Sequence, residues 1–400
     1  MKMSDHPRLV SIHDALKLVA ANRPLLNTEQ VTLENCLGRT LFDDVLANVT
    51  VPPLDASAMD GYAVRFSDVR ESGATLAVIG EVAAGSPNTF SIGEEEAVRV
   101  FTGSPMPKGA DHILIQEHAN ACDDQITVAR PQETARHIRR AGGDFCKGDR
   151  VLEAGTRLGP RHIGVAAAAN HGSLLVKRRP KIAILTAGSE LRPPGSILLD
   201  GQIAESNSFT LSKLLESRGA ELTVLGAARD DEQNIDSKFE EAQSADIIVT
   251  VGGASVGKHD LVRTVFTKRG GEFVFERIAV RPGKPTWLGK LDNQTILGLP
   301  GNPTAAFVMI SLLMDALTLG AETLDFTDAI LSKPLLANGP RETFIRGRLE
   351  LEKGVARVHS LKDQDTSRVH ALTSTNCFIH RAEHAPEKSD GDLVQIVLLD

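Results

Sequence analysis

The chain has 400 residues and a mass of 42.9 kDa, which is more than one hydrophobic core usually supports, so we expect two to four domains. Apolar residues make up 42% and charged residues 24% of the chain, and this balance excludes a disordered protein. Forty-four basic and fifty-two acidic residues give a net charge of −8, which excludes a surface that attracts nucleic acid as a whole. An anion would therefore have to bind at a local site.

The apolar runs and the cysteines of the sequence indicate the cellular location of the protein. The longest apolar run that we find spans residues 163–169, whereas a membrane span needs ~20 residues, so we expect no transmembrane helix. The polar start, residues 1–10, predicts no signal peptide. The four cysteines are far apart and form no C-x-x-C pair, which is typical of a protein in a reducing cytoplasm.

The N-terminal part of the chain predicts one helix followed by loops and strands. Ser11 stands at an N-cap position with Asp14 in the first turn, and Asn22 with Pro24 ends the helix. Residues 51–62 contain prolines and an Asp-Gly pair, which predicts an ordered loop. Short runs separated by Gly, Pro and Asp then predict a small β-rich domain, with strands at 76–79, 97–101, 112–115 and 126–128. A short buried helix is expected at 163–169.

From residue 180 onward, predicted strands alternate with predicted helices. The strands are expected at 182–186, 222–225, 247–251 and 295–299, and the helices at 207–218, 232–243, 261–269 and 304–319. This alternation favours parallel pairing with right-handed crossovers. After residue 333 only strands are expected, at 344–351, 355–358, 376–380 and 393–399. The predicted fold class is α/β plus β: a multi-domain chain with a central parallel α/β domain, a small β-rich domain and a C-terminal β domain.

Three loops of the α/β region carry small and charged residues. They span 186–190, 252–260 and 299–304, and each follows a predicted strand. Ligands of open α/β sheets bind at the carboxyl ends of the strands, and glycine lets backbone N–H groups approach an anion. The loops therefore predict a site for a phosphorylated ligand. Residues 252–258 also fit G-x-x-x-x-G-K, but His259 stands where a nucleotide P-loop needs Ser or Thr, which leaves a plain glycine turn as the alternative.

Carboxylates and cations accompany these loops. Asp60, Glu190, Asp230 and Asp260 lie in turn-rich segments, where each alone is typical of a cap or a solvated carboxylate. As a group they can hold Mg²⁺, which takes one or two carboxylates together with phosphate oxygens. Arg277 and Arg281 are four residues apart and would share one face of a strand, either as a fork for an oxyanion or as surface residues. Lys284 adds a point charge.

Taken together, these segments make the chain resemble the molybdopterin molybdenumtransferase family, the MoeA-type enzymes, to which the C-terminal region of gephyrin belongs. The resemblance covers essentially the whole chain. Its specific motifs are Ser-Ala-Met-Asp-Gly-Tyr at 57–62 and Gly-Leu-Pro-Gly-Asn-Pro at 298–303. The other matching segments are 99–103, 138–142 with 147–149, 186–191, 252–257 with Asp260, 281–285, 346–367 and 376–399.

The resemblance implies four domains and a dimer. The expected boundaries are 1–45 with 142–179 for an elongated N-terminal domain, 46–141 for the β-rich domain, 180–328 for the α/β molybdopterin-binding domain and 329–400 for the C-terminal β domain. The active cleft is expected in a homodimer, between the α/β domain of one subunit and the β-rich domain of the other. A separate molybdopterin adenylyltransferase is an expected partner.

The implied activity is the insertion of molybdate into adenylylated molybdopterin, with release of AMP and with Mg²⁺ as the cofactor. We assign catalytic roles to Asp60, Thr102, Glu190, Asp230 and Asp260, of which Glu190, Asp230 and Asp260 are the expected metal ligands. Substrate-binding roles are assigned to Ser57, Gly252, Gly253, Ser255, Arg277, Arg281, Lys284, Pro300, Asn302, Pro303, Arg346 and Ser367. The family often has lysines at positions 277 and 281, so a planar fork replaces a point charge here.

Two other functions remain open at this stage. One is a gephyrin-like scaffold without turnover, for which the apolar helix expected at 304–319 would be an interface or, alternatively, a core helix. The other is a phosphate-binding enzyme of different chemistry on the same α/β domain, such as a nucleotide pyrophosphatase. A pyrophosphatase needs no oxyanion pocket, so binding of molybdate or tungstate separates it from a molybdenum-inserting enzyme.

Overall fold

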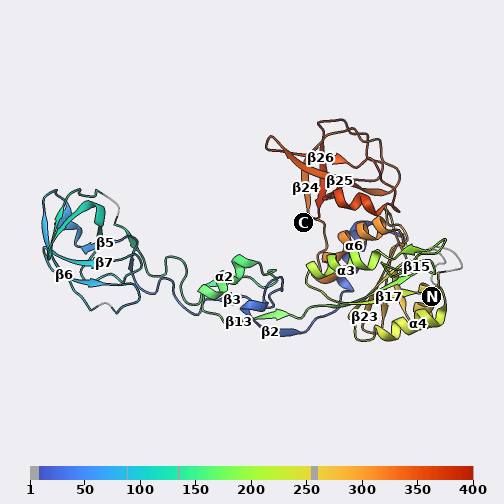
Figure 1. The fold of residues 1–400 in the computed structure, drawn as a ribbon, viewed down its shortest axis with the longest axis horizontal. Helices are drawn as coiled ribbons and strands as arrows, with labels where there is room; N and C mark the ends of the chain where they lie inside the picture. Colours follow the sequence, from blue (N-terminus) through green and yellow to red (C-terminus); the bar gives the residue numbers. More distant parts are fainter. Residues whose placement is uncertain (1–8, 88, 134–135, 254–259, 400) are drawn as a thin grey trace. The chain divides into compact units, whose positions relative to one another are not determined.

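The computed structural model describes residues 9–87, 89–133, 136–253 and 260–399. The chain divides into two compact units, which we describe separately (Figure 1). Unit 1 comprises residues 1–27 and 179–400, and unit 2 comprises residues 28–178. Both units contain sheets and unit 1 holds the longer helices, so the predicted multi-domain α/β plus β class is confirmed. The four domain boundaries given above stay a prediction.

A six-stranded sheet forms the centre of unit 1, in the order β17-β14-β18-β23-β22-β19. Its strands are β14 (Lys181–Ala187), β17 (Glu221–Ala228), β18 (Ile247–Val251), β19 (Glu272–Phe275), β22 (Trp287–Leu291) and β23 (Gln294–Leu299). The strands predicted as parallel, β14, β17, β18 and β23, do pair in parallel. β22 and β19, which the sequence analysis did not predict, extend the sheet in antiparallel fashion. The sheet is therefore mixed, with its parallel part on the predicted strands.

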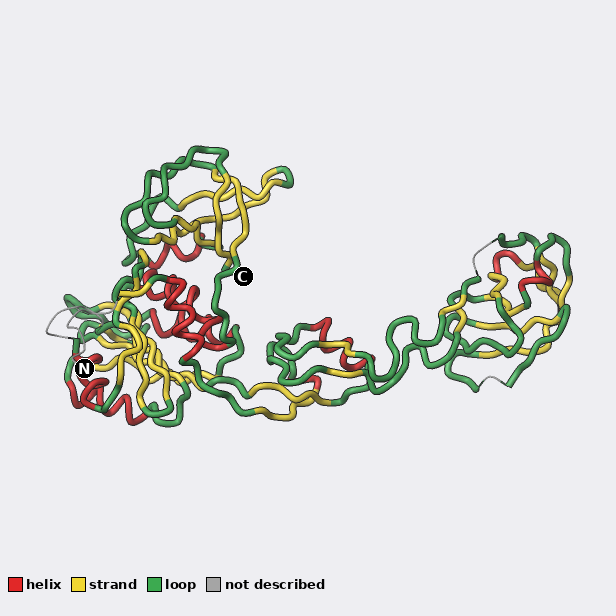
Figure 2. The backbone as a smooth tube through the Cα atoms, turned by 180° about the vertical axis from the view of Figure 1, so that it is seen from behind, coloured by secondary structure: helices red, strands yellow, loops and turns green. Residues whose placement is uncertain are grey.

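Helices cover both faces of this sheet, as Figure 2 shows. On one face lie α1 (Ile12–Ala21), α3 (Asn207–Ser217) and α6 (Pro303–Thr318), and on the other α4 (Glu232–Glu241) and α5 (Leu261–Lys268). Side chains of a strand alternate between its faces, so Ile182 and Ile184 contact the first layer while Ala183 and Leu185 contact the second. The result is a three-layer α/β/α arrangement.

The two best-defined helix predictions concern α1 and α6. Ser11 is the N-cap of α1, and its Oγ accepts a hydrogen bond from the Asp14 backbone N–H at 3.0 Å, as predicted. α6 is buried along most of its length, which confirms the core-helix alternative for this segment. Within the described residues, no helix combines the length and the apolar character that a membrane span requires.

The C-terminal part of unit 1 is a small barrel. Its strands are β24 (Phe326–Leu331), β25 (Glu342–Glu352), β26 (Val355–Ser360), β27 (Cys377–Arg381) and β28 (Leu393–Leu398). The pairing runs β25-β26-β24-β28-β27 and closes because β27 also pairs with β25. The short helix η4 (Val369–Ser374) interrupts the connection from β26 to β27. Every strand predicted after residue 333 is present, and β24 is an addition.

Unit 2 contains a second six-stranded sheet, in the order β8-β5-β7-β6-β10-β9. Its strands are β5 (Gly61–Val64), β6 (Thr75–Val82), β7 (Glu96–Val100), β8 (His112–Ile115), β9 (Ala119–Cys122) and β10 (Gln125–Val128). The segment 51–62, predicted as a loop, instead contributes β4 (Ala56–Ser57) and the start of β5. The cause is the close pairing of β5 with β8: a Cβ atom at Gly61 would lie 2.2 Å from the Leu114 carbonyl oxygen, so glycine permits the strand.

The remainder of unit 2 is built from two-stranded ribbons and one helix. The ribbons pair β2 (Thr28–Thr32) with β13 (Ser173–Lys177), β3 (Val45–Leu46) with β12 (Arg150–Leu152), and β4 with β11 (Ile138–Arg139). The helix expected at 163–169 is present as α2 (Pro160–Ala168), but the prediction that it is buried is wrong. Only Ala166 of this helix is fully buried, because the helix contacts its small core cluster along a single edge.

Candidate active site

The three glycine-rich loops of unit 1 meet at one edge of the central sheet. The strands that precede them are parallel and adjacent, so their carboxyl ends lie side by side. Two backbone hydrogen bonds join loops to the ends of neighbouring strands: Gly188 N–H donates to the Ala228 carbonyl at the end of β17 at 3.2 Å, and Gly252 N–H donates to the Leu299 carbonyl at the end of β23 at 3.2 Å. This is the edge at which open α/β sheets bind their ligands.

Glu190 and Asp230 lie on adjacent loops of this edge, after β14 and β17. The backbone N–H of Ser189 donates to Asp230 Oδ2 at 3.0 Å, and the backbone N–H of Asp230 donates to Ser189 Oγ at 3.2 Å. The Glu190 carboxylate folds over Gly188, where a Cβ atom would lie 2.8 Å from its Oε2. Both carboxylates are exposed. The reciprocal hydrogen bonds therefore fix the position of Asp230, and within the described residues its other carboxylate oxygen accepts no hydrogen bond.

Asp260 is the buried carboxylate of the predicted set. It is the N-cap of α5, and its Oδ1 accepts a hydrogen bond from the Arg263 backbone N–H at 3.0 Å. Its Oδ2 is buried, lies 3.9 Å from Arg263 Nε and has no hydrogen-bond partner among the residues that the structure describes. Burial raises the pKa of Asp260 to about 6. A buried carboxylate oxygen without a partner is unfavourable unless a ligand supplies one.

Gly252 and Gly253 shape the chain just before this carboxylate. Their φ angles are +87° and +63°, and a Cβ atom at Gly252 would lie 2.4 Å from the Ala187 carbonyl oxygen. Both positions therefore require glycine. Ser255 and the remainder of the P-loop-like segment, residues 254–259, lie outside the described residues.

Arg277 and Arg281 do not share a strand, contrary to the prediction. β20 (Arg277–Ile278) pairs with β1 (Leu9–Val10), whereas β21 (Val280–Arg281) pairs with β25 of the barrel. The chain changes sheet between these strands, so the two-residue alternation that would align the guanidinium groups is lost. Arg277 is half-buried and Arg281 is exposed.

A cavity of about 830 Å³ lies between the α/β layers and the barrel of unit 1. Its lining includes five of the predicted substrate-binding residues: Arg281, Lys284, Pro300, Asn302 and Arg346. Pro303 begins α6 directly after Asn302, and Ser367 follows the lining residue Thr366. With Arg341, which the sequence analysis missed, the lining drawn from the described residues contains four cations and one acidic residue, Asp365. The cavity is therefore suited to an oxyanion.

Arg346 is predicted to contact substrate, but its side chain is more deeply buried than such a contact needs. Its side chain is 2% exposed, and its Nη2 donates to the carbonyl oxygens of Asp363 at 3.0 Å and Asp365 at 3.1 Å. Burial lowers the pKa of Arg346, although an arginine keeps its charge at any physiological pH. Its Nη1 is buried and unpartnered among the described residues. One donor group thus remains for a ligand while the other organises the 363–365 loop.

The predicted site residues of unit 2 form a separate cluster. Asp60 Oδ1 accepts hydrogen bonds from the Thr102 backbone N–H at 2.7 Å and from Thr102 Oγ1 at 3.0 Å. These bonds, with a contribution from Arg99, hold the pKa of Asp60 below its usual value. Asp60 is exposed, whereas Ser57 is fully buried and its hydroxyl donates to the Met59 carbonyl at 2.5 Å. Ser57 therefore supports the loop, and Asp60 is the group that faces solvent.

The sequence analysis also missed a second cavity of unit 1, of about 750 Å³, beside Ser189. Its lining includes Arg192, Glu205 and Arg229. Nearby, the Asn207 side-chain amide donates to the Gly301 carbonyl at 2.9 Å and so connects the start of α3 to the loop after β23. The polar residues 205–207 at the start of the predicted helix 207–218 were the available signal, since such residues are typical of helix starts.

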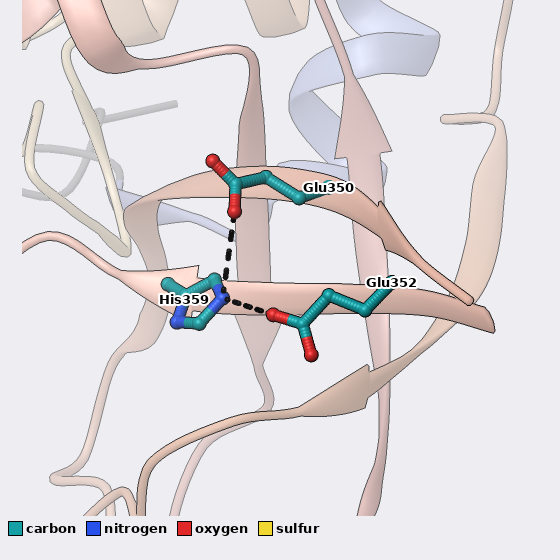
Figure 3. Close-up of side chains that lie close together, drawn as sticks. All are labelled: Glu350, Glu352 and His359. Carbon is teal, nitrogen blue, oxygen red and sulfur yellow. Dashed lines mark hydrogen bonds and ion pairs between the residues drawn. The ribbon is translucent and has the colours of Figure 1, made fainter. Parts of the chain in front are cut away.

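The structure also brings together Glu350, Glu352 and His359, on β25 and β26 (Figure 3). His359 Nε2 lies 3.3 Å from Glu352 Oε1 and 3.9 Å from Glu350 Oε2. Each carboxylate already pairs with an arginine, Glu350 with Arg348 at 2.7 Å and Glu352 with Arg357 at 3.5 Å. Since these cations neutralise the carboxylates, the cluster is explained as a surface ion-pair network.

The predicted metal ligands Glu190, Asp230 and Asp260 form no group of three within mutual ligand distance in the described part of the chain. This is compatible with Mg²⁺, which needs only one or two carboxylates when a substrate phosphate supplies further oxygens. The unpartnered Oδ2 of Asp260 is the atom that best fits such an ion.

The fold and the site define a multi-domain α/β enzyme class with a cation-lined pocket beside the carboxyl edge of its sheet. Three family profiles match the chain: the MoeA N-terminal region (domain I and II) at residues 10–170, the "Probable molybdopterin binding domain" at 183–319, and the MoeA C-terminal region (domain IV) at 328–399.

Known proteins agree with these profiles over nearly the whole chain. A molybdopterin molybdenumtransferase from Haemophilus influenzae is 36% identical over 378 residues, which are 92% of this chain and 93% of that protein. A protein of the same name from Nostoc is 31% identical, over 87% of this chain and 84% of its own length. The crystal structure of the MoeA molybdopterin biosynthesis protein from Pyrococcus horikoshii is 29% identical, covers 98% of this chain and 100% of its own, and has a TM-score of 0.82.

The chain therefore belongs to the MoeA family of molybdopterin molybdenumtransferases, as its motifs predict. It is a transferase of molybdenum cofactor biosynthesis.

Proposed function

We propose that the protein inserts molybdate into adenylylated molybdopterin and releases AMP, with Mg²⁺ as cofactor. The observation that carries this proposal is the cavity at which Arg281, Lys284 and Arg346 meet the loop of Pro300 and Asn302. It lies in the same unit as the glycine-rich carboxyl edge of the sheet. An oxyanion pocket beside a phosphate-type site is what a reaction between two anions requires.

The cations that line the cavity offset the electrostatic repulsion between the two anionic substrates. Two unit charges of like sign repel by roughly 1 kcal/mol at 4 Å in water, and by several times more in a partly dry cleft. Arg281 and Lys284 present exposed cations to the cavity, and the buried Arg346 adds a donor that needs no reorientation. We therefore assign to these three residues the binding and orientation of the oxyanion.

Asp260 and Asp230 are the residues that would hold Mg²⁺. Asp260, which follows β18, offers its Oδ2, which has no partner among the described residues, and the backbone hydrogen bond from Ser189 fixes Asp230 after β17, on the far side of β14 in the sheet. A bound Mg²⁺ supplies charge neutralisation and orientation of the pyrophosphate. Glu190, on the same edge, is assigned to the substrate or to the hydration shell of the ion.

Asp60 and Thr102 belong to unit 2, and we propose that they complete the site in a homodimer. This proposal is supported by the exposure of Asp60 and by the two hydrogen bonds that hold it in one orientation, because such a carboxylate is available to a ligand or to a second subunit. A cytoplasmic location and the docking of a separate adenylyltransferase stay predictions.

The decisive experiment measures AMP released from adenylylated molybdopterin when molybdate is added. We expect release that requires Mg²⁺, that a chelator abolishes, and that an Asp260→Asn variant lowers by on the order of 100-fold. Molybdate binding by calorimetry, without nucleotide, distinguishes this function from a simple pyrophosphatase. Release of AMP that does not depend on molybdate would contradict the proposed function. Full turnover by Asp260→Asn would contradict the role assigned to Asp260.

A further inference from the structure

Two of the segments that line the oxyanion cavity come from separate parts of unit 1. One is the loop that leads from β23 into α6, with Pro300 and Asn302. The other is the loop 360–366, between β26 and η4 of the barrel. The shape of the cavity therefore depends in part on what holds these two loops together.

Thr366 makes the contacts that join them. Its Oγ1 accepts a hydrogen bond from the Asn302 side-chain amide at 2.7 Å. Its carbonyl oxygen accepts two more, from the Thr304 backbone N–H at 3.1 Å and from Thr304 Oγ1 at 2.9 Å. Thr304 is fully buried. The barrel loop thus bonds to both residues that flank Pro303, the first residue of α6.

These contacts take the place of a local helix cap. Asn302 is the N-cap residue of α6, yet its side chain makes no capping hydrogen bond within the helix. The first N–H groups of a helix lack intrahelical partners, and here the carbonyl of Thr366 satisfies the one on Thr304. Asn302 contributes through its amide nitrogen, which cannot accept a capping hydrogen bond and donates to Thr366 Oγ1. The start of α6 is therefore capped from the barrel.

The barrel loop is itself well determined, so its attachment point sets the position of the whole wall. Arg346 Nη2 bonds the carbonyls of Asp363 and Asp365, and Asp365 Oδ1 accepts hydrogen bonds from the backbone N–H and the Oγ of Ser367, both at 2.9 Å. A shift at Thr366 would therefore move Ser367 and the backbone around Arg346 together.

We propose that Thr366 is a positioning residue of the oxyanion site: its hydroxyl, bonded to the Asn302 amide, holds the barrel loop in register with the α6 loop. This inference rests on the proposed function, because it concerns the same site. It assigns to Thr366 no contact with substrate. Its role is to keep the cations and Ser367 at the spacing that the oxyanion needs.

A substitution series at position 366 tests this role. Thr366→Val keeps the shape but removes the acceptor, and we expect the KM for molybdate to rise by about 10-fold while kcat changes much less. Thr366→Ser keeps the hydroxyl and should restore a KM near that of the wild type. Thr373→Val is the matched control, because the hydroxyl of Thr373 donates to the nearby His370 carbonyl, in the same short helix η4. Calorimetry with molybdate alone should give the same ranking.

A double-mutant cycle separates positioning from a general loss of stability. If the Thr366 hydroxyl acts through Asn302, the effect of Thr366→Val on the molybdate Kd should vanish in an Asn302→Ala background. Three results would each overturn the inference. They are additive effects of the two substitutions, an equal loss of molybdate affinity in Thr366→Val and Thr366→Ser, and an unchanged molybdate Kd in Thr366→Val. A wild-type protein that binds molybdate but releases no AMP would overturn the proposed reaction. The role of Thr366 would then be tested by the ranking of the molybdate Kd values alone. A wild type that does not bind molybdate would overturn both.

Discussion

Asp60 depends on Thr102 for its orientation and on its charge for any role in the reaction. Two donors from one residue hold its Oδ1, and the carboxylate is otherwise exposed. Charge and orientation can therefore be removed separately by substitution. A residue that acts by charge should respond more strongly to the loss of the carboxylate than to the loss of one hydrogen bond.

For this pair we predict that Asp60→Asn lowers AMP release by on the order of 100-fold, whereas Thr102→Val, which leaves the backbone donor in place, lowers it by only about 5-fold. Circular dichroism and unfolding curves should match the wild type, since both side chains lie at the surface. If Thr102→Val proved more harmful than Asp60→Asn, the threonine itself would have to be the group that contacts substrate.

His112 predicts a pH dependence of the stability of unit 2. The ring is fully buried on Phe66, with ring centroids 5.0 Å apart, and neither nitrogen has a hydrogen-bond partner among the described residues. Burial, with smaller contributions from His137 and Arg136, lowers the pKa of His112 to about 4, while Asp111 and Gln132 oppose the shift. The folded state therefore keeps the ring neutral where the unfolded chain binds a proton.

Below the unfolded pKa of about 6.5, the unfolded state binds more protons than the native state, so stability falls with falling pH. Between pH 6.5 and 4 the loss should approach about 3 kcal/mol. Denaturant unfolding of the wild type and of His112→Phe over this range measures it. The variant should lose distinctly less stability on acidification, and parallel pH profiles would show that other groups dominate.

At the scale of elements, the turn between β21 and β22 is fitted tightly against α6. Gly283 has φ of +122°, and a Cβ atom there would lie 2.1 Å from Sδ and 2.3 Å from Cγ of the buried Met309. The turn carries Arg281 and Lys284 into the oxyanion cavity. The contact between glycine and helix therefore determines where two of the cations stand.

We predict that Gly283→Ala destabilises unit 1 by about 1–3 kcal/mol more than Gly195→Ala, and that it weakens molybdate binding as well. Gly195 is the matched control because its φ is also positive, at +85°, but no atom lies within 4 Å of its added Cβ. Both effects can be read from denaturant midpoints and from calorimetry. Equal destabilisation by the two substitutions would mean that strain in the backbone, and not the contact with Met309, limits the turn.

At the scale of the whole molecule, the proposed site draws on both compact units of the chain. Asp60 and Thr102 lie in unit 2, whereas the oxyanion cavity and Asp260 lie in unit 1. The proposed dimer makes each site from two subunits. Defects in different units should then complement each other.

Asp60→Asn and Asp260→Asn should each be nearly inactive alone. After subunits have exchanged in an equal mixture, half of the dimers are mixed and each has one intact site, so about a quarter of wild-type activity should return. AMP release after mild dissociation and reassociation measures this recovery. No recovery, under conditions in which mixed dimers are demonstrated by mass, would place both carboxylates in a site within one subunit.

Local rules were sufficient where a segment depends on its own residues. The cap of α1 at Ser11, the parallel strands β14, β17, β18 and β23, and the helices α3, α4, α5 and α6 follow from side-chain periodicity and from breakers at their ends. They failed where a distant partner decides the conformation. Residues 61–64 are a strand because β7 and β8 flank them, and Arg277 and Arg281 part because the chain changes sheet between them.

By itself, the sequence determined the class of fold, the family, and the set of loops that carry the chemistry, because these depend on residue types and on their order. Only the tertiary structure decided that Arg346 is largely committed to the 363–365 loop, that Ser57 is buried, and that Thr366 caps α6 from the barrel. Such roles depend on which hydrogen-bonding groups of distant segments meet, and a polar residue shows no sign of its partner until the chain is folded.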